Sequence, residues 1–267
     1  MNLLFDLDGT LTDPALGITR CIAFALEQMG LEPPAPSQLT WCIGPPLGDS
    51  FRTLLHSASE MDSAQTHAMS EASRAQASLQ NAAKPSAASG GADGRSPSEQ
   101  LVSDEAVAKA IALYRERFRE VGMLENELIA GVPEVLAVLA ASGHRLFVAT
   151  SKPHVYARAI LKHFDLATHF EAIHGAELDG TRSHKADLIA HVLEVERLAP
   201  AHTLMIGDRH HDIDGARANS LESIGVLWGY GSQEELEGAG CGDVAAKPSE
   251  LPECIARLRT RDCDLKG

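Results

Sequence analysis

The sequence predicts an α/β fold in which a doubly wound, Rossmann-like parallel sheet carries an inserted helical domain. Short apolar runs of strand length recur along the chain, and amphipathic segments of helical period lie between the later runs. Strands that alternate with helices in this way form a parallel sheet covered on both faces. Between the first and second runs, by contrast, the chain carries only helical patterns and a low-complexity tract. We therefore expect a smaller helical domain early in the chain.

The expected strands are apolar runs bounded by polar or small residues. They cover residues 3–5, 145–149, 170–173, 203–206 and 223–227, with a weaker run at 243–246. Helical patterns cover residues 132–142, 154–163, 185–196 and 212–219. The first of these helices opens with Pro133 and is closed by Gly143, which is the preferred placement of both residues. These elements assign residues 1–13 and 130–267 to the core.

The helical insertion is expected at residues 14–129. Asp13 would cap its first helix, with Pro14 at the first helical position. One apolar stripe follows the helix as far as Gly30 and consists of Ile18, Ile22, Ala25, Leu26 and Met29. Two further helical stretches are expected at residues 46–56 and 103–121.

A low-complexity tract separates these last two stretches. Residues 57–100 are rich in Ala, Ser, Gln and Gly and have almost no large apolar side chain. Such a segment cannot bury enough surface to offset its ordering entropy. We expect a solvated insertion without a function of its own, and a flexible loop at residues 81–98 whose deletion leaves the fold intact.

Composition excludes several classes of partner. The 267 residues carry a formal net charge of −14, which disfavours nucleic acid and anionic membranes. No stretch reaches the roughly 20 apolar residues of a membrane span. The five cysteines are scattered without C-x-x-C spacing, which suits a reducing compartment better than a disulfide framework. We therefore expect a cytoplasmic protein, and the oligomeric state stays open.

The first expected strand ends at two carboxylates. Asp6 and Asp8 are two residues apart, so their side chains point to the same side of an extended chain. Two such carboxylates repel each other unless a cation or a proton lies between them. Gly9 follows and lets the backbone turn tightly near a ligand. Taken alone, this pattern fits a metal-binding site and a solvated turn about equally well.

Polar side chains also follow the second strand and begin a later helix. Thr150 and Ser151 lie where parallel sheets bind ligands, although Ser151 could equally cap the next helix. Lys185 begins an amphipathic helix, and a lysine is common on any helix surface. The first turn is nevertheless unfavourable for a cation, and this mismatch favours a functional role for Lys185.

The strand at residues 203–206 also stops near a carboxylate. Asp208 follows it, and Asp212 comes four residues later, where it could serve as a helix cap. His210 and His211 lie between them and suggest zinc, but no third nitrogen or sulfur ligand occurs at a suitable spacing. All these polar residues fall at strand or helix ends, in order along the chain.

Together, the motifs resemble the haloacid dehalogenase superfamily of phosphohydrolases over nearly the whole chain. The matching residues are Asp6-Leu7-Asp8-Gly9-Thr10, Thr150, Lys185, Gly207-Asp208 and Asp212. The helical insertion between the first two motifs resembles the C1 cap subgroup. Residues 150–153, 178–182 and 225–231 are most similar to the phosphoglycolate phosphatase-like and 5′-nucleotidase-like branch. The tract at residues 57–100 departs from the compact cap of that branch, so the substrate stays open.

The resemblance implies a Mg²⁺-dependent phosphatase that hydrolyses a small phosphorylated metabolite, similar to phosphoglycolate, through an aspartyl phosphate. Asp6 would be the nucleophile, and Asp8 the general acid and base. Asp6, Asp208 and the backbone carbonyl of Asp8 would hold Mg²⁺. Asp212 would orient the ligand shell of the metal.

The resemblance also implies how the phosphoryl group is bound. Lys185 would supply a second positive charge to the phosphoryl oxygens. Thr150 would donate its hydroxyl, helped by backbone N–H groups near Gly9 and Ser151. Specificity would come from cap residues over the site. The candidates are Arg20, Trp41, Arg52 and Arg117.

Other functions share parts of this pattern. A 5′-nucleotidase or a phosphomutase keeps all four motifs, whereas dehalogenases of this superfamily lack the second aspartate, so Asp8 argues for phosphoryl chemistry. Two non-enzymatic alternatives are a receiver domain that accepts a phosphoryl group and a module that only binds phosphoesters. Receivers are much shorter than this chain, and the intact motifs argue against a binding module.

Overall fold

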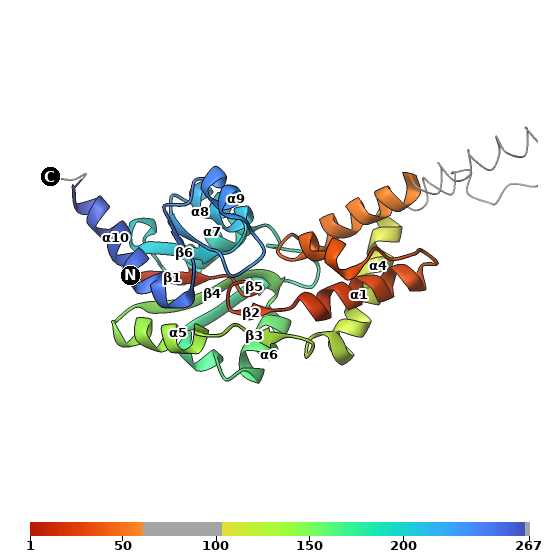
Figure 1. The fold of residues 1–267 in the computed structure, drawn as a ribbon, viewed down its shortest axis with the longest axis horizontal. Helices are drawn as coiled ribbons and strands as arrows, with labels where there is room; N and C mark the ends of the chain where they lie inside the picture. The colour runs from red at the N-terminus through yellow and green to blue at the C-terminus, as the bar shows by residue number, and fades with distance from the viewer. Residues whose placement is uncertain (61–102, 265–267) are drawn as a thin grey trace, which may run out of the picture.

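The structure, a computed structural model, describes residues 1–60 and 103–264. Its centre is a six-stranded sheet with the strand order β5-β4-β1-β6-β7-β8, in which every neighbouring pair is parallel (Figure 1). The strands are β1 (Asn2–Phe5), β4 (Arg145–Pro153), β5 (Ala172–Ala176), β6 (Thr203–Gly207), β7 (Glu222–Val226) and β8 (Asp243–Ala245). The expected parallel α/β fold is confirmed.

Helices cover both faces of this sheet (Figure 1). They are α5 (Val132–Ala141), α6 (His154–His163), α7 (Lys185–Val195), α8 (His210–Ala218), α9 (Gln233–Ala239) and α10 (Leu251–Asp264). Because side chains alternate along a strand, β1 contributes to both layers. Leu4 packs in one apolar cluster with α7 and α8, whereas Leu3 and Phe5 pack in the other with α5 and α6. Within the described ranges, no helix combines the length and apolar character that a membrane span needs.

A helical region lies beside the sheet and is inserted between β1 and α5 (Figure 1). Helix α1 (Ala15–Gln28) packs against α4 (Asp104–Arg117), and another helix covers residues 47–60. α4 continues into a π-helix, η3 (Phe118–Gly122). The antiparallel strands β2 (Thr12–Asp13) and β3 (Glu127–Leu128) join the two ends of the insertion to each other. Most of the tract at residues 57–100, including 81–98, lies outside the described residues.

Two local expectations need correction. Asp13 is not the N-cap of α1, because the helix begins at Ala15 with Pro14 in the cap position. Asp13 still supports the helix start, since its Oδ1 accepts a hydrogen bond from the N–H of Ala15 at 2.9 Å. β4 also extends four residues beyond the expected end, to Pro153, because it keeps pairing with β5 across a register shift after Thr150.

Candidate active site

A tight turn after β1 fixes the first two carboxylates. Asp6 and Asp8 are buried there, with 4% and 7% of their surfaces exposed. The N–H of Gly9 donates to the carbonyl of Thr12 at 2.7 Å, so this N–H is not free to bind a phosphoryl oxygen. Gly9 has a φ of +86°, and a Cβ atom at this position would lie 2.2 Å from Oδ2 of Asp208. Both the backbone conformation and the close approach of Asp208 therefore require glycine.

Lys185 provides a buried positive charge beside this turn. It is the first residue of α7. Its Nζ lies 2.7 Å from Oδ1 of Asp6 and 2.8 Å from Oδ1 of Asp212, and donates to the carbonyl of Ala149 at 2.9 Å. Burial alone would lower the pKa of Lys185, but the charges of Asp212 and Asp6 outweigh it and raise this pKa above its usual value. These partners account for a cation in the first turn of the helix.

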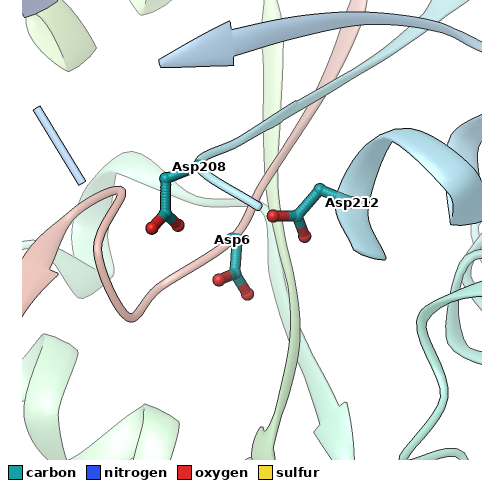
Figure 2. A group of neighbouring side chains, drawn as sticks. All are labelled: Asp6, Asp208 and Asp212. Carbon is teal, nitrogen blue, oxygen red and sulfur yellow. The ribbon is translucent and has the colours of Figure 1, made fainter. Parts of the chain in front are cut away.

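Three buried carboxylates converge next to Lys185 (Figure 2). Asp6 comes from the end of β1, Asp208 follows β6, and Asp212 belongs to the first turn of α8. One oxygen from each lies within 4.8 Å of the other two. Because α8 begins at His210, Asp212 is not the cap residue before the helix, but its side chain folds back toward the helix start. Its Oδ2 accepts a hydrogen bond from the N–H of Arg209 at 3.2 Å.

The cluster carries more negative charge than its surroundings neutralise. Asp208 accepts hydrogen bonds from Oγ1 of Thr10 at 3.1 Å and from the N–H of Tyr230 at 2.9 Å. Burial and the neighbouring carboxylates nevertheless raise the pKa of Asp208 well above its usual range. Burial also raises the pKa of Asp212 to about 6, although Lys185 acts against it. A cation bound here would stabilise the ionised cluster.

The chemistry of the donor set fits the metal that the sequence suggests. The three clustered side chains offer only carboxylate oxygens, which suit a hard divalent cation such as Mg²⁺. Among the described residues, no histidine or cysteine joins the cluster. Nδ1 of His210 instead lies 3.1 Å from Oδ2 of Asp214. Burial, followed by the charge of His210, lowers the pKa of His211 to about 4. The zinc interpretation therefore gains no support.

The end of β4 adds two further side chains. Thr150 is buried, and its Oγ1 accepts a hydrogen bond from the N–H of Lys152 at 3.3 Å. Nζ of Lys152 lies 2.5 Å from Oδ2 of Asp8, an ion pair that the sequence analysis missed. Burial raises the pKa of Asp8, although the charge of Lys152 acts against it. The strand period offered a signal, because Lys152 is two residues beyond Thr150 and therefore on the same side.

A cleft of about 500 Å³ opens over these residues, between the sheet and the helical region. The core lines it with Asp6, Asp8, Thr150, Ser151 and Lys152. The helical region contributes two arginines and several apolar or aromatic side chains, among them Arg52, Ile111, Tyr114, Arg115 and Phe118.

The four cap residues expected to set specificity lie in different places. Arg52 lines the cleft, whereas Arg20, Trp41 and Arg117 are not part of its lining. Arg20 and Arg117 instead pair with Glu125, at 2.7 Å and 2.8 Å. Arg115, which the sequence analysis did not single out, lines the cleft.

Comparison with known proteins gives a consistent assignment. A family model described as haloacid dehalogenase-like hydrolase matches residues 3–226. A 5′-nucleotidase from Pseudomonas aeruginosa is 43% identical over 250 residues, which cover 92% of each chain. The tyrosine-protein kinase PtkA of Mycobacterium tuberculosis is 33% identical, over 95% of this chain and 72% of its own. The phosphoglycolate phosphatase of Escherichia coli is 27% identical, over 88% of this chain and 84% of its own.

The same assignment follows from the fold. The crystal structure of a predicted phosphatase from Clostridium acetobutylicum matches with a TM-score of 0.76 and 34% sequence identity, covering 96% of this chain and 98% of that one. The family match spans most of the chain and includes the carboxylates of the cluster, so the resemblance drawn from the motifs is confirmed. The chain belongs to the haloacid dehalogenase-like hydrolase family and is a phosphatase of that family.

Proposed function

We propose that this phosphatase uses Mg²⁺ and an aspartyl phosphate on Asp6 to hydrolyse a small phosphomonoester, with a nucleoside 5′-monophosphate preferred to phosphoglycolate. The observation that carries the chemistry is the buried contact of Asp6 with Lys185 beside two further carboxylates, next to an open cleft. A carboxylate can approach an anionic phosphoryl group when cations lie beside it, because the cations neutralise the repulsion between the two anions.

The reaction then takes two displacement steps. A carboxylate oxygen of Asp6 attacks phosphorus, and the bond from phosphorus to the ester oxygen breaks. The departing oxygen takes a proton from the carboxyl group of Asp8 and leaves as an alcohol. A water molecule next gives a proton back to Asp8 and attacks phosphorus. The bond between Asp6 and phosphorus breaks, and inorganic phosphate leaves.

The clustered oxygens would hold the metal. Asp6 and Asp208 would bind Mg²⁺ together with the backbone carbonyl of Asp8, and Asp212 is close enough to complete the set. An ion held by these residues would supply positive charge that offsets the repulsion between the carboxylate of Asp6 and an anionic phosphoryl group. Because Lys185 touches both Asp6 and Asp212, it would hold the nucleophile in place and supply a second neutralising charge beside it.

Hydrogen-bond donors at the end of β4 would orient the phosphoryl group. Oγ1 of Thr150 accepts from the backbone of Lys152, which leaves its O–H free to donate. Ser151 lines the cleft beside it. The residues from 14 to 129 would act as the cap that encloses the substrate and excludes water.

The cleft supports a nucleotide better than a two-carbon acid. A volume of about 500 Å³ is typical of sites for larger organic ligands, and phosphoglycolate would leave much of it to water. Tyr156, which is half-buried, offers aromatic surface for a base, and Arg115 offers positive charge. The relative named 5′-nucleotidase is 43% identical, against 27% for the one named phosphoglycolate phosphatase. Both arguments favour the nucleotide over the phosphoglycolate-like substrate suggested by the motifs.

A panel of phosphorylated compounds tests this proposal. Phosphate release is measured with Mg²⁺ for nucleoside 5′-monophosphates, phosphoglycolate and hexose phosphates. We expect kcat/KM for a 5′-nucleotide to exceed that for phosphoglycolate at least about tenfold, which is 1.4 kcal/mol of discrimination. The reverse order would overturn the substrate assignment. Conversion of a hexose 1-phosphate to its 6-phosphate, or transfer from ATP to a tyrosine peptide, without phosphate release would overturn the hydrolytic mechanism.

A further inference from the structure

We infer that Lys152 is a positioning residue that orients Asp8 for proton transfer, an inference that rests on the proposed function. Nζ of Lys152 lies 2.5 Å from Oδ2 of Asp8, and the two side chains are only 6% and 10% exposed. Oδ1 of Asp8 is also buried and accepts no hydrogen bond from any described residue. One oxygen is therefore held by Lys152, whereas the other has no partner among the described residues, and the residue itself lines the cleft.

Residues from the core and from the helical region hold Lys152 in this position. Its backbone N–H donates to Oγ1 of Thr150 at 3.3 Å. Its ammonium group lies 5.1 Å from the centre of the Phe118 ring, a favourable cation–π arrangement. Phe118 stacks on Tyr114 at 5.5 Å and meets Tyr156 edge-on at 5.1 Å. This aromatic wall limits the access of water to the ion pair and strengthens it.

The two buried lysines serve different carboxylates. Lys185 binds Asp6 and Asp212, whereas Lys152 binds Asp8. Each of the two carboxylates in the turn after β1 is thus held by its own lysine. Without Lys152, the carboxylate of Asp8 would lose the contact that fixes its Oδ2 and would rotate away from the reacting oxygen.

The consequence differs between substrates according to the leaving group. An alkyl ester, such as a nucleoside 5′-monophosphate, needs a proton on its departing oxygen. p-Nitrophenolate is a stable anion and departs without one. General acid catalysis contributes roughly 10²–10⁴-fold where it is needed. A misplaced Asp8 therefore slows the first displacement, in which the leaving group departs, much more for the alkyl ester than for p-nitrophenyl phosphate, whereas a general loss of structure slows it alike for both.

Lys152→Met tests the inference, with Lys162→Met on the exposed side of α6 as the matched control. We expect the rate of leaving-group release in a single turnover at saturating enzyme to fall at least about tenfold more for the 5′-nucleotide than for p-nitrophenyl phosphate, because this step precedes the attack of water that both substrates share. Lys152→Arg, which keeps the charge, should recover part of the difference, and Lys162→Met should change neither rate. In an Asp8→Asn background, Lys152→Met should lower the rate for the 5′-nucleotide by less than about a further twofold, because a residue that acts through Asp8 then has no general acid to orient.

Equal losses for the two substrates would overturn the inference, as would an undiminished effect of Lys152→Met in the Asp8→Asn background. A raised KM with unchanged kcat would make Lys152 a substrate-binding residue instead. If Lys152→Met fails to fold, the same comparison in Lys152→Gln, which also removes the charge, decides. Wild-type protein that hydrolyses neither substrate with Mg²⁺ would refute the proposed function itself, which separates the two failures.

Discussion

Replacing Lys185 with methionine tests how the acidic cluster is balanced. The substitution keeps a long apolar side chain but removes a charge that lies 2.7 Å and 2.8 Å from two carboxylates. Removing one partner of a buried ion pair costs roughly 3–5 kcal/mol. The carbonyl of Ala149 also loses its hydrogen bond from this lysine, at about 1–3 kcal/mol for a buried group left unpaired. We expect the free energy of unfolding in EDTA to fall by at least about 4 kcal/mol.

Added Mg²⁺ should reduce this loss. An ion at a hundred times its dissociation constant stabilises any variant that binds it by about 2.7 kcal/mol. The Lys185→Met protein should gain more than the wild type, because its carboxylates have lost their competing cation and attract the metal more strongly. Its phosphatase activity should stay low even with Mg²⁺, since the nucleophile has lost its second neutralising charge.

Guanidinium unfolding followed by circular dichroism, in EDTA and in Mg²⁺, measures both quantities. Lys162→Met, which removes an exposed lysine from α6, is the control and should change stability by less than about 0.5 kcal/mol. If the free energy of unfolding of Lys185→Met in EDTA is within 1.4 kcal/mol of the wild-type value, a tenfold change in the equilibrium constant, Lys185 does not balance the cluster. An equal gain from Mg²⁺ in both proteins would refute the argument about competition.

Three further predictions concern the metal and the turn. The stabilisation conferred by Mg²⁺ should grow as the pH rises from about 5 to about 7, because the raised pKa values of Asp208 and Asp212 let protons compete with the metal at low pH. Paired unfolding curves in which Mg²⁺ raises the free energy of unfolding equally at both pH values would contradict this. EDTA should abolish phosphate release and Mg²⁺ restore it, while Ca²⁺ should not, because its larger and looser shell spoils the in-line geometry; full activity after exhaustive chelation would count against a metal. Gly9→Ala should lower kcat at least about a hundredfold, or about 2.7 kcal/mol, because its Cβ would displace Asp208. Gly30 has a similar φ of +80° and no atom near the position of a Cβ, so Gly30→Ala should leave kcat unchanged and lower only the stability. Equal losses of kcat in the two variants would contradict the steric explanation.

Much of the fold could be predicted from local patterns. Each of the six apolar runs overlaps a strand, and the central strands β1, β4 and β6 are largely buried on both faces, whereas the edge strands β5 and β8 are only partly buried. The helix bounds at His154–His163 agree with the pattern at both ends. The ribbon of β2 and β3 was missed, since two residues per strand carry no period. The start of α1 was missed by one residue, because Asp13 supports the helix from outside it.

The residues of the site that belong to motifs at strand ends could be predicted from the sequence. The contacts that form only when distant segments of the chain meet could not. The convergence of Asp6, Asp208 and Asp212 follows from the parallel sheet, whose strand ends meet at one edge. The pair of Lys152 with Asp8 joins residues 144 positions apart, so the strand period could place Lys152 on the side of Thr150 but could not identify Asp8 as its partner. Arg115 and Arg117 are two positions apart on α4 and therefore point to different sides of the helix, a choice that spacing alone could not make.

The most direct test of the central claim is to trap the phosphorylated enzyme. Protein mixed with ³²P-labelled substrate is quenched in acid within one turnover, and one portion is counted for protein-bound label. A second portion is reduced with borohydride, which expels the phosphate and converts the acyl phosphate to an alcohol, and the reduced residue is located by mass spectrometry. The first portion should carry label, and the reduced residue in the second should be Asp6. Asp6→Asn should carry no label and lose at least about three decades in kcat, or about 4 kcal/mol of barrier. A label on another residue, or an Asp6→Asn protein that keeps a tenth or more of the wild-type turnover, would contradict the account.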